Sequence, residues 1–110
     1  MNRGDVYSCR FDPTEGSEQS GIRPAVIVSR TSMNSIRRTV MVVPVTSNLA
    51  RRAPFHAALS RGDGGLLTDS VALADQLRTV SKERLGRSWG TLSPAAMLGI
   101  DEALRVALDL

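Results

Sequence analysis

The residues with the clearest chemistry stand in two polar segments, each beside an apolar, β-branched run. Residues 16–24 form a loop with glycines at 16 and 21 that ends in Arg23 and Pro24. About twenty residues later, a second apolar run ends in Thr46 and Ser47. Glycine allows close backbone approach to a ligand, and proline is tolerated at the first residue of a strand. A guanidinium and two hydroxyls at the ends of neighbouring strands would bind one anion, which predicts a phosphodiester site.

Other catalytic chemistries find little support in the residue counts. The chain has one histidine and one cysteine, so a metal site built on His-x-x-x-His or Cys-x-x-Cys spacing is not expected, and neither is a cofactor. A pair of catalytic histidines is excluded by count, and there is no Gly-x-Ser-x-Gly elbow. His56 lies between Phe55 and Ala57 in an expected strand, where a structural or surface role is more typical than that of a general base.

RNA offers a reaction that needs no protein nucleophile, because its 2′-hydroxyl can attack the adjacent phosphorus and expel the 5′-oxygen. The protein must then hold the strand for in-line attack, neutralise charge on the phosphorane and move two protons. Arg23 is suited to the charge, with the Thr46 hydroxyl as a second donor. Glu18 and Asp75 are the candidates for proton transfer, although pairing of Glu18 with Arg23 would make Glu18 a weaker base.

The positive charge is concentrated in the middle of the chain. Residues 1–18 and 63–110 each sum to −2, and the segment between them contains seven basic residues and no acid, giving a net charge of +3. Thirteen of the fourteen basic residues are arginine, which binds phosphate bidentately and stacks on bases. A polyanionic partner is therefore favoured, although a GC-rich genome would produce the same bias. The basic residues of this segment are Arg23, Arg30, Arg37, Arg38, Arg51, Arg52 and Arg61.

The elements that must position these residues are short strands followed by one helix. Alternation or continuous apolar character predicts strands over residues 5–11, 24–29, 40–45, 55–59, 69–73 and 89–92, of which the first is expected to be half-buried. Residues 75–80 are expected to continue or bend the fifth strand. Short helical turns are expected over residues 31–34 and 82–85, the second ending at Gly86.

A final helix begins at Ser93, because a capping hydroxyl is followed by Pro94 at the first helical position. Its expected buried stripe is Met97, Ile100, Leu104, Ala107 and Leu108, with Asp101, Glu102 and Arg105 outward. We expect one domain over residues 1–110, mainly β with α: a small antiparallel barrel with short helices and a C-terminal helix. A single cysteine, the absence of a 20-residue apolar segment and a start unlike a signal peptide predict a cytoplasmic protein without a membrane partner.

Four sequence blocks together resemble the MazF/PemK toxins of bacterial toxin-antitoxin modules. They are Arg3-Gly4-Asp5-Val6-Tyr7, residues 16–24, Pro44-Val45-Thr46-Ser47 and Ala74-Asp75-Gln76-Leu77-Arg78-Thr79, in this order along nearly the whole chain. The resemblance implies a Src-homology-three-like (PemK/CcdB-like) barrel. It also implies a metal-independent, sequence-specific endoribonuclease (an mRNA interferase) that cuts single-stranded RNA, leaving a 2′,3′-cyclic phosphate and a 5′-hydroxyl. The implied partners are a second copy of the chain, as a homodimer, and a small MazE-like antitoxin whose acidic tail suits the basic middle segment.

By the same resemblance, the catalytic candidates are Arg23, Thr46 and Glu18. Candidates for acid/base or RNA-binding roles are Asp75, Ser47 and Gln76, and candidates for RNA binding are Ser17, Gln19, Arg51, Arg52 and Arg78. Ser17 and Leu73 stand where one branch of the family has a histidine and an arginine. A mechanism that uses those two groups is therefore not expected in this chain.

Structural interpretations stay open for several of these residues. Arg23 could serve only to pair with Glu18, Thr46 could cap its own turn, and Asp75 could be satisfied within a bend. Trp89 is more typical of a core or dimer contact than of a base-stacking platform. The functional alternatives are a non-enzymatic, CcdB-like inhibitor of DNA gyrase that acts through the C-terminal helix, and an RNA-binding regulator without catalysis.

Overall fold

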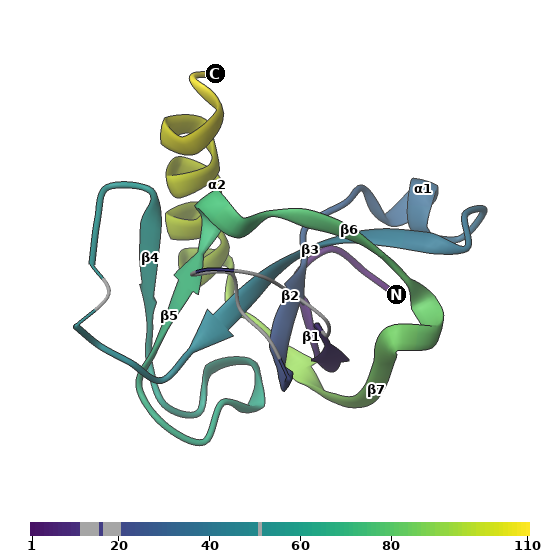
Figure 1. Cartoon of the computed structure of the whole chain (residues 1–110), viewed down its shortest axis with the longest axis horizontal. Helices are drawn as coiled ribbons and strands as arrows, with labels where there is room; N and C mark the ends of the chain where they lie inside the picture. Colours follow the sequence, from purple (N-terminus) through teal and green to yellow (C-terminus); the bar gives the residue numbers. More distant parts are fainter. Residues whose placement is uncertain (12–15, 17–20, 51) are drawn as a thin grey trace.

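The computed structural model describes residues 1–11, 16, 21–50 and 52–110 (Figure 1). Within these residues, seven strands, two α-helices and three 3₁₀ turns follow one another along the chain. The strands are β1 (Asp5–Arg10), β2 (Ile22–Ile27), β3 (Thr39–Thr46), β4 (His56–Leu59), β5 (Ser70–Leu73), β6 (Arg78–Ser81) and β7 (Leu85–Thr91). The helices are α1 (Thr31–Asn34) and α2 (Pro94–Leu108), and the 3₁₀ turns are Asp63–Gly65, Ala74–Gln76 and Lys82–Arg84.

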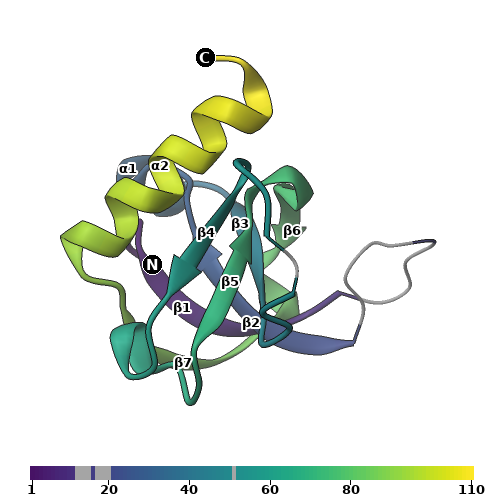
Figure 2. The ribbon, with the colours of Figure 1, turned by 90° about the vertical axis from the view of Figure 1, so that its left-hand side faces the viewer.

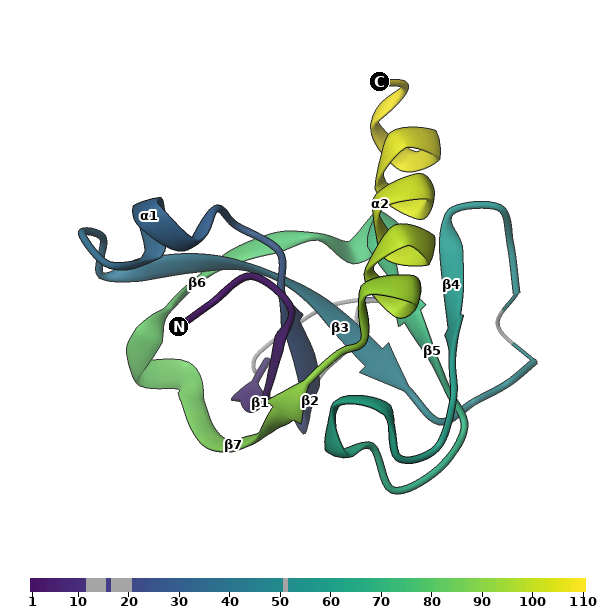
Figure 3. The same ribbon diagram turned by 180° about the vertical axis from the view of Figure 1, so that it is seen from behind.

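The strands form one antiparallel sheet in the order β4-β5-β3-β2-β1-β7, with β6 paired to β3 off this path. β3 organises the sheet because its first half pairs with β6, from Thr39 opposite Ser81 to Val42 opposite Arg78. Its last residues pair with β5 instead. The middle of β3 pairs with β2 as far as Ala25 opposite Pro44. Beyond that pair, β2 and β3 diverge (Figures 1 and 3), which opens the sheet at the ends of both strands.

The alternation of side chains divides the buried residues between two sides of the sheet. One side carries Val6, Val26, Val43, Val45 and Ala72, which pack with Ile100 and Ala103 of α2. The other side carries Cys9, Phe11, Ala25, Ile27, Val40, Val42 and Val80. β1 therefore contributes to both cores through Val6 and Cys9, while its other residues are half-buried or exposed, in agreement with the expectation of a half-buried first strand. We call the first side the helix side and the second the open side.

Helix α2 begins as the sequence predicts. The Ser93 hydroxyl accepts a hydrogen bond from the Ala96 N–H at 3.2 Å, with Pro94 in the first turn. Asp63 fixes this start, because its carboxylate accepts from the Ser93 N–H and hydroxyl at 2.8 and 2.7 Å. Helix α2 packs against β4 and the 3₁₀ turn Ala74–Gln76; seen from behind, it runs beside β4 and in front of β5 (Figure 3), and the side view in Figure 2 shows it along one edge of the strands. In the described part of the chain, no helix is long and apolar enough to cross a bilayer.

The stripe predicted for α2 is partly wrong. Leu108 is 50% exposed, and the buried position of the last turns is Ala103 instead. Asp101, which was expected to point outward, is half-buried and pairs with Arg3 at 2.5 Å. This ion pair ties the N-terminal segment to the helix. Asp101 is four residues after Met97 and three before Leu104, so helical spacing places it beside the stripe, and only its charge suggested the outer face.

Strand positions agree with the sequence analysis, whereas several boundaries differ. β2 begins two residues before Pro24, because Ile22 and Arg23 pair with β1, and it ends at Ile27 rather than at residue 29. β7 starts at Leu85, so the expected helix over 82–85 is only a 3₁₀ turn. Of the two outcomes expected for residues 75–80, the structure shows the bend and not a continuation of β5. The 3₁₀ turn Ala74–Gln76 redirects the chain, and β6 then crosses to β3.

Candidate functional site

Arg23 and Thr46 lie on the same side of the sheet. Arg23 pairs with Cys9, and Thr46 lies two residues beyond Pro44, which pairs with Ala25. Because side chains alternate, both residues face the open side. If the β2–β3 ladder ran two residues further, they would be directly opposite each other. The β2–β3 pairing ends at Ala25 and Pro44, and the two strands diverge beyond that pair (Figure 1), so Arg23 and Thr46 lie past the end of the ladder on one side of the sheet.

Thr46 combines a structural contact with remaining donor capacity. The residue is 5% exposed, and its hydroxyl oxygen accepts a hydrogen bond from the Asn48 N–H at 3.1 Å. This contact is the turn chemistry that the sequence left open. A hydroxyl that accepts one bond can still donate its proton, so the turn fixes the oxygen in place without consuming the donor. The neighbouring Ser47 is exposed, as is Arg23.

A polar cavity of about 470 Å³ lies on the same side of the sheet, and among the described residues neither Arg23 nor Thr46 lines it. Its lining comes from the residue after β1, from β3, from the chain between β5 and β6 and from the start of β6: Phe11, Pro44, Asp75, Gln76, Leu77, Arg78 and Thr79. The Arg78 guanidinium lies 5.5 Å from the centre of the Phe11 ring, in a cation–π contact that holds it at the wall. The structure thus brings Asp75, Gln76 and Arg78, expected from the resemblance, to one cavity on the side of Arg23 and Thr46.

The sequence analysis missed the partner of Asp75. His56 at the start of β4 places its Nε2 atom 3.0 Å from the Asp75 Oδ1 atom. The His56 side chain is 8% exposed and that of Asp75 is 38% exposed. The β4–β5 register brings them together, because His56 pairs with Leu73, two residues before Asp75. The expectation of a structural histidine is met in part, but its contact is with a lining residue of the cavity.

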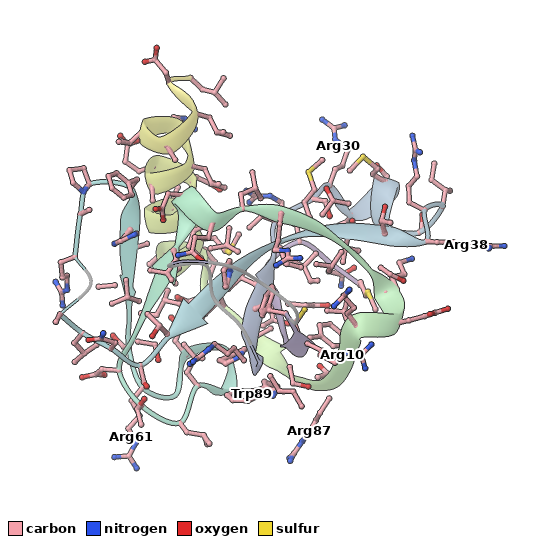
Figure 4. The ribbon with its side chains drawn as sticks, viewed as in Figure 1. Arg10, Arg30, Arg38, Arg61, Arg87 and Trp89 are labelled. Carbon is pink, nitrogen blue, oxygen red and sulfur yellow. The ribbon has the colours of Figure 1, made fainter. Side chains whose placement is uncertain are left out.

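Three arginines of the middle segment lie far apart on the molecule (Figure 4). In Figure 4, Arg30 and Arg38 lie near α1 and the start of β3, whereas Arg61 lies at the opposite end of the molecule. Arg52 is exposed in the connection from β3 to β4. Four residues expected at the site fall outside the described residues: Ser17, Glu18, Gln19 and Arg51. Clustering of charge in sequence is therefore a poor guide to a basic patch here.

Two further residues belong to the scaffold. Cys9 is fully buried, and burial raises the pKa of its thiol, so the unreactive role expected from the strand pattern agrees with its surroundings. Trp89 is partly buried against the helix-side core. Gly65 lies against it with a positive φ of 80°, and a Cβ there would stand 2.1 Å from the Trp89 carbonyl oxygen. Only glycine fits this close approach.

Comparison with known proteins identifies the class that this fold and cavity define. The model of "PemK-like, MazF-like toxin of type II toxin-antitoxin system" matches residues 2–108. Endoribonuclease MazF9 of Mycobacterium tuberculosis is 43% identical over 115 residues, covering 100% of this chain and 98% of the relative. Endoribonuclease MazF of Staphylococcus epidermidis is 37% identical over 111 residues, covering 100% and 92%.

Solved structures agree with these relationships. A mycobacterial endoribonuclease in complex with its cognate antitoxin is 32% identical, with a TM-score of 0.85 over 100% of this chain and 96% of that chain. MazF from Deinococcus radiodurans is 26% identical, with a TM-score of 0.86 over 100% and 97%. The chain belongs to the family of PemK-like, MazF-like toxins of type II toxin-antitoxin systems. The expected family and the mainly β fold with a C-terminal helix are thereby confirmed.

Proposed function

We propose that this MazF-type endoribonuclease toxin cuts single-stranded RNA at specific sequences without a metal ion. In the proposed reaction the 2′-oxygen bonds to the adjacent phosphorus while the bond from phosphorus to the 5′-oxygen breaks. The 2′-hydroxyl loses a proton to a base, and the leaving 5′-oxygen gains one from an acid. The products are a 2′,3′-cyclic phosphate and a 5′-hydroxyl. Full-length relatives named as endoribonucleases support this reaction over gyrase inhibition.

The observation that carries the proposal is the placement of Arg23 and Thr46 on the open side, flanking the end of the β2–β3 ladder. Arg23 would neutralise the developing charge on the phosphorane, because a guanidinium is always charged and can bind two oxygens at once. The Thr46 hydroxyl, held by the Asn48 N–H, would donate to the same phosphate. Both groups would act mainly in the transition state, where the negative charge is greatest.

Two carboxylates are proposed for the proton transfers. Glu18 precedes Arg23 by five residues and is our candidate base, and Asp75 in the cavity wall is our candidate for an acid/base or RNA-binding role. Ser47, Gln76, Arg52 and Arg78, together with Ser17, Gln19 and Arg51, are proposed to contact RNA outside the scissile phosphate. Arg78 is supported in this by its place on the cavity wall beside an aromatic ring.

We further propose a homodimer that a MazE-like antitoxin neutralises in the cytoplasm. Support for the antitoxin comes from the related mycobacterial endoribonuclease, whose structure contains its cognate antitoxin, and from a MazE-MazF structure of Deinococcus radiodurans at 26% identity. The acid-free middle segment of this chain would suit an acidic partner.

The test is incubation with a single-stranded RNA oligomer and its DNA counterpart in excess EDTA, followed by mass spectrometry of the ends. We expect RNA to be cut to cyclic phosphate and 5′-hydroxyl ends while DNA stays intact. Cleavage of DNA, or complete loss of RNA cleavage on addition of the chelator, would contradict the proposal. A cleavage map on total RNA then gives the recognition sequence.

A further inference from the structure

We propose that His56 is a positioning residue that fixes the Asp75 carboxylate for contact with RNA. The inference rests on the proposed function and assigns a role to a histidine outside the predicted site. It starts from the 3.0 Å contact between His56 Nε2 and Asp75 Oδ1, at the edge of the cavity of about 470 Å³.

The geometry fixes His56 far more firmly than Asp75. The His56 side chain is 8% exposed, and the Phe55 ring meets the imidazole edge-to-face with the ring centres 4.9 Å apart. By the β4–β5 and β5–β3 registers, His56 lies on the same side of the sheet as Thr46. Asp75 has left the sheet in a 3₁₀ turn, and its side chain is 38% exposed. The buried ring therefore acts as the fixed partner and the carboxylate as the oriented one.

The ring nitrogens indicate which tautomer makes the contact. His56 Nδ1 is buried and has no hydrogen-bond partner among the described residues. A proton on Nδ1 would leave an unpaired N–H in the interior, which costs more than leaving a bare nitrogen there. The tautomer with its proton on Nε2 avoids this cost and donates to the Asp75 carboxylate.

This donation leaves one carboxylate oxygen for RNA. The contact with His56 uses Oδ1, and Oδ2 is the second acceptor of the same carboxylate. A carboxylate accepts but does not donate, so Oδ2 suits a hydroxyl or N–H group of the RNA. A freely rotating aspartate would lose this orientation, and a displacement of about 1 Å at a reacting group can cost roughly 100-fold in rate.

The test uses three substitutions of His56 that differ in where an N–H is placed. His56→Gln puts an amide nitrogen near the position of Nε2, His56→Asn puts one near the buried Nδ1, and His56→Phe removes both. We expect His56→Phe and His56→Asn to slow single-turnover RNA cleavage by roughly 10- to 100-fold, and His56→Gln to restore most of the rate. In an Asp75→Asn background, His56→Phe should change the rate less than about twofold, because the two residues act as one unit.

Thermal unfolding of each variant separates the loss of rate from a loss of stability. If His56 had only a structural role, its substitution would lower the melting temperature equally in the parent and in the Asp75→Asn background. In that case His56→Gln would not be the one variant that restores the rate. The proposal is overturned by a His56→Phe rate equal to that of the parent, by an equal loss in the Asp75→Asn background, or by an Asp75→Asn variant as active as the parent.

A second readout keeps this test independent of the proposed reaction. Affinity is measured for the same oligomer carrying a single 2′-deoxynucleotide at the mapped cleavage site, which cannot be cut there by 2′-oxygen attack, or for the unmodified oligomer if the parent does not cut it. If the parent does not cleave RNA, the proposed function fails, yet weaker binding by His56→Phe that disappears in the Asp75→Asn background still supports the pair. If neither affinity nor rate responds to His56→Phe, the positioning role fails while parent cleavage leaves the proposed function standing.

Discussion

The two sides of the sheet are built from the same strands but have different roles: the helix side stabilises the fold, and the open side carries the candidate site. On the helix side, apolar residues of five strands pack with Ile100 and Ala103 of α2, and the polar contacts there anchor the helix. The open side has an apolar centre. Arg23, Thr46 and the cavity that Asp75 lines lie around it, near the ends of strands. Alternation along a strand thus separates residues that stabilise the fold from residues available for chemistry, and the two groups should respond differently to substitution.

The largest expected effect lies on the helix side. Ile100→Ala removes a fully buried side chain between α2 and the sheet and should lower the free energy of unfolding by about 2–5 kcal/mol. Urea unfolding measures this loss. At a temperature where the variant is still folded, RNA cleavage should stay within about twofold of the parent, because the open side is untouched. A fully folded variant with strongly reduced cleavage would mean that the two sides are not separable.

On the open side, Arg23→Lys should lower the cleavage rate and leave the stability unchanged. A point charge cannot reproduce the planar fork of the guanidinium, so single-turnover cleavage should fall by about 100- to 1000-fold while RNA binding and stability are retained. The matched control is Arg61→Lys, since Arg61 points away at the far end of the molecule (Figure 4) and should keep the parent rate. An unchanged rate for Arg23→Lys would remove Arg23 from the mechanism.

Thr46→Val tests the second donor with a smaller expected effect. Loss of the hydroxyl should slow cleavage by about 10- to 100-fold, less than a charged donor would. It should also cost about 1 kcal/mol of stability, because the Asn48 N–H loses its acceptor. Thr46→Ser keeps the hydroxyl and should retain most of the rate. If Thr46→Val cleaved RNA as fast as the parent, the Thr46 hydroxyl would have only its structural contact with the Asn48 N–H.

The sequence predicts those features of the helix side and the open side that depend on neighbouring residues, and it does not predict those that depend on contacts between distant segments. The start of α2 and the site segments at Arg23 and Thr46 follow from neighbouring residues, and their placement on one side follows from alternation once β2 and β3 pair. The His56–Asp75 contact depends on the register of β4 against β5, which leaves no local signal, and on the 3₁₀ turn that redirects the chain, which the sequence offers only as one of two outcomes. The dispersion of Arg30, Arg38 and Arg61 likewise depends on where strands end in space.

The smallest expected effect concerns the anchoring of α2. Ser93→Ala removes the N-cap contact to Ala96 and the hydroxyl contact to Asp63, and should cost about 1 kcal/mol of stability with no change in cleavage rate. Calorimetry under matched conditions provides the measurement. If Ser93→Ala lowered the cleavage rate without lowering the stability, the start of α2 would belong to the functional site. The two sides of the sheet would then not differ in their response to substitution.

The central claim is that the RNA supplies its own nucleophile on the open side. After the cleavage site has been mapped, its nucleotide is replaced by the 2′-deoxy form in an otherwise unchanged RNA, and both oligomers are incubated with the protein in EDTA. We expect the two to bind with similar affinity and only the unmodified RNA to be cut. Cleavage of the substituted oligomer at the same position would contradict the mechanism.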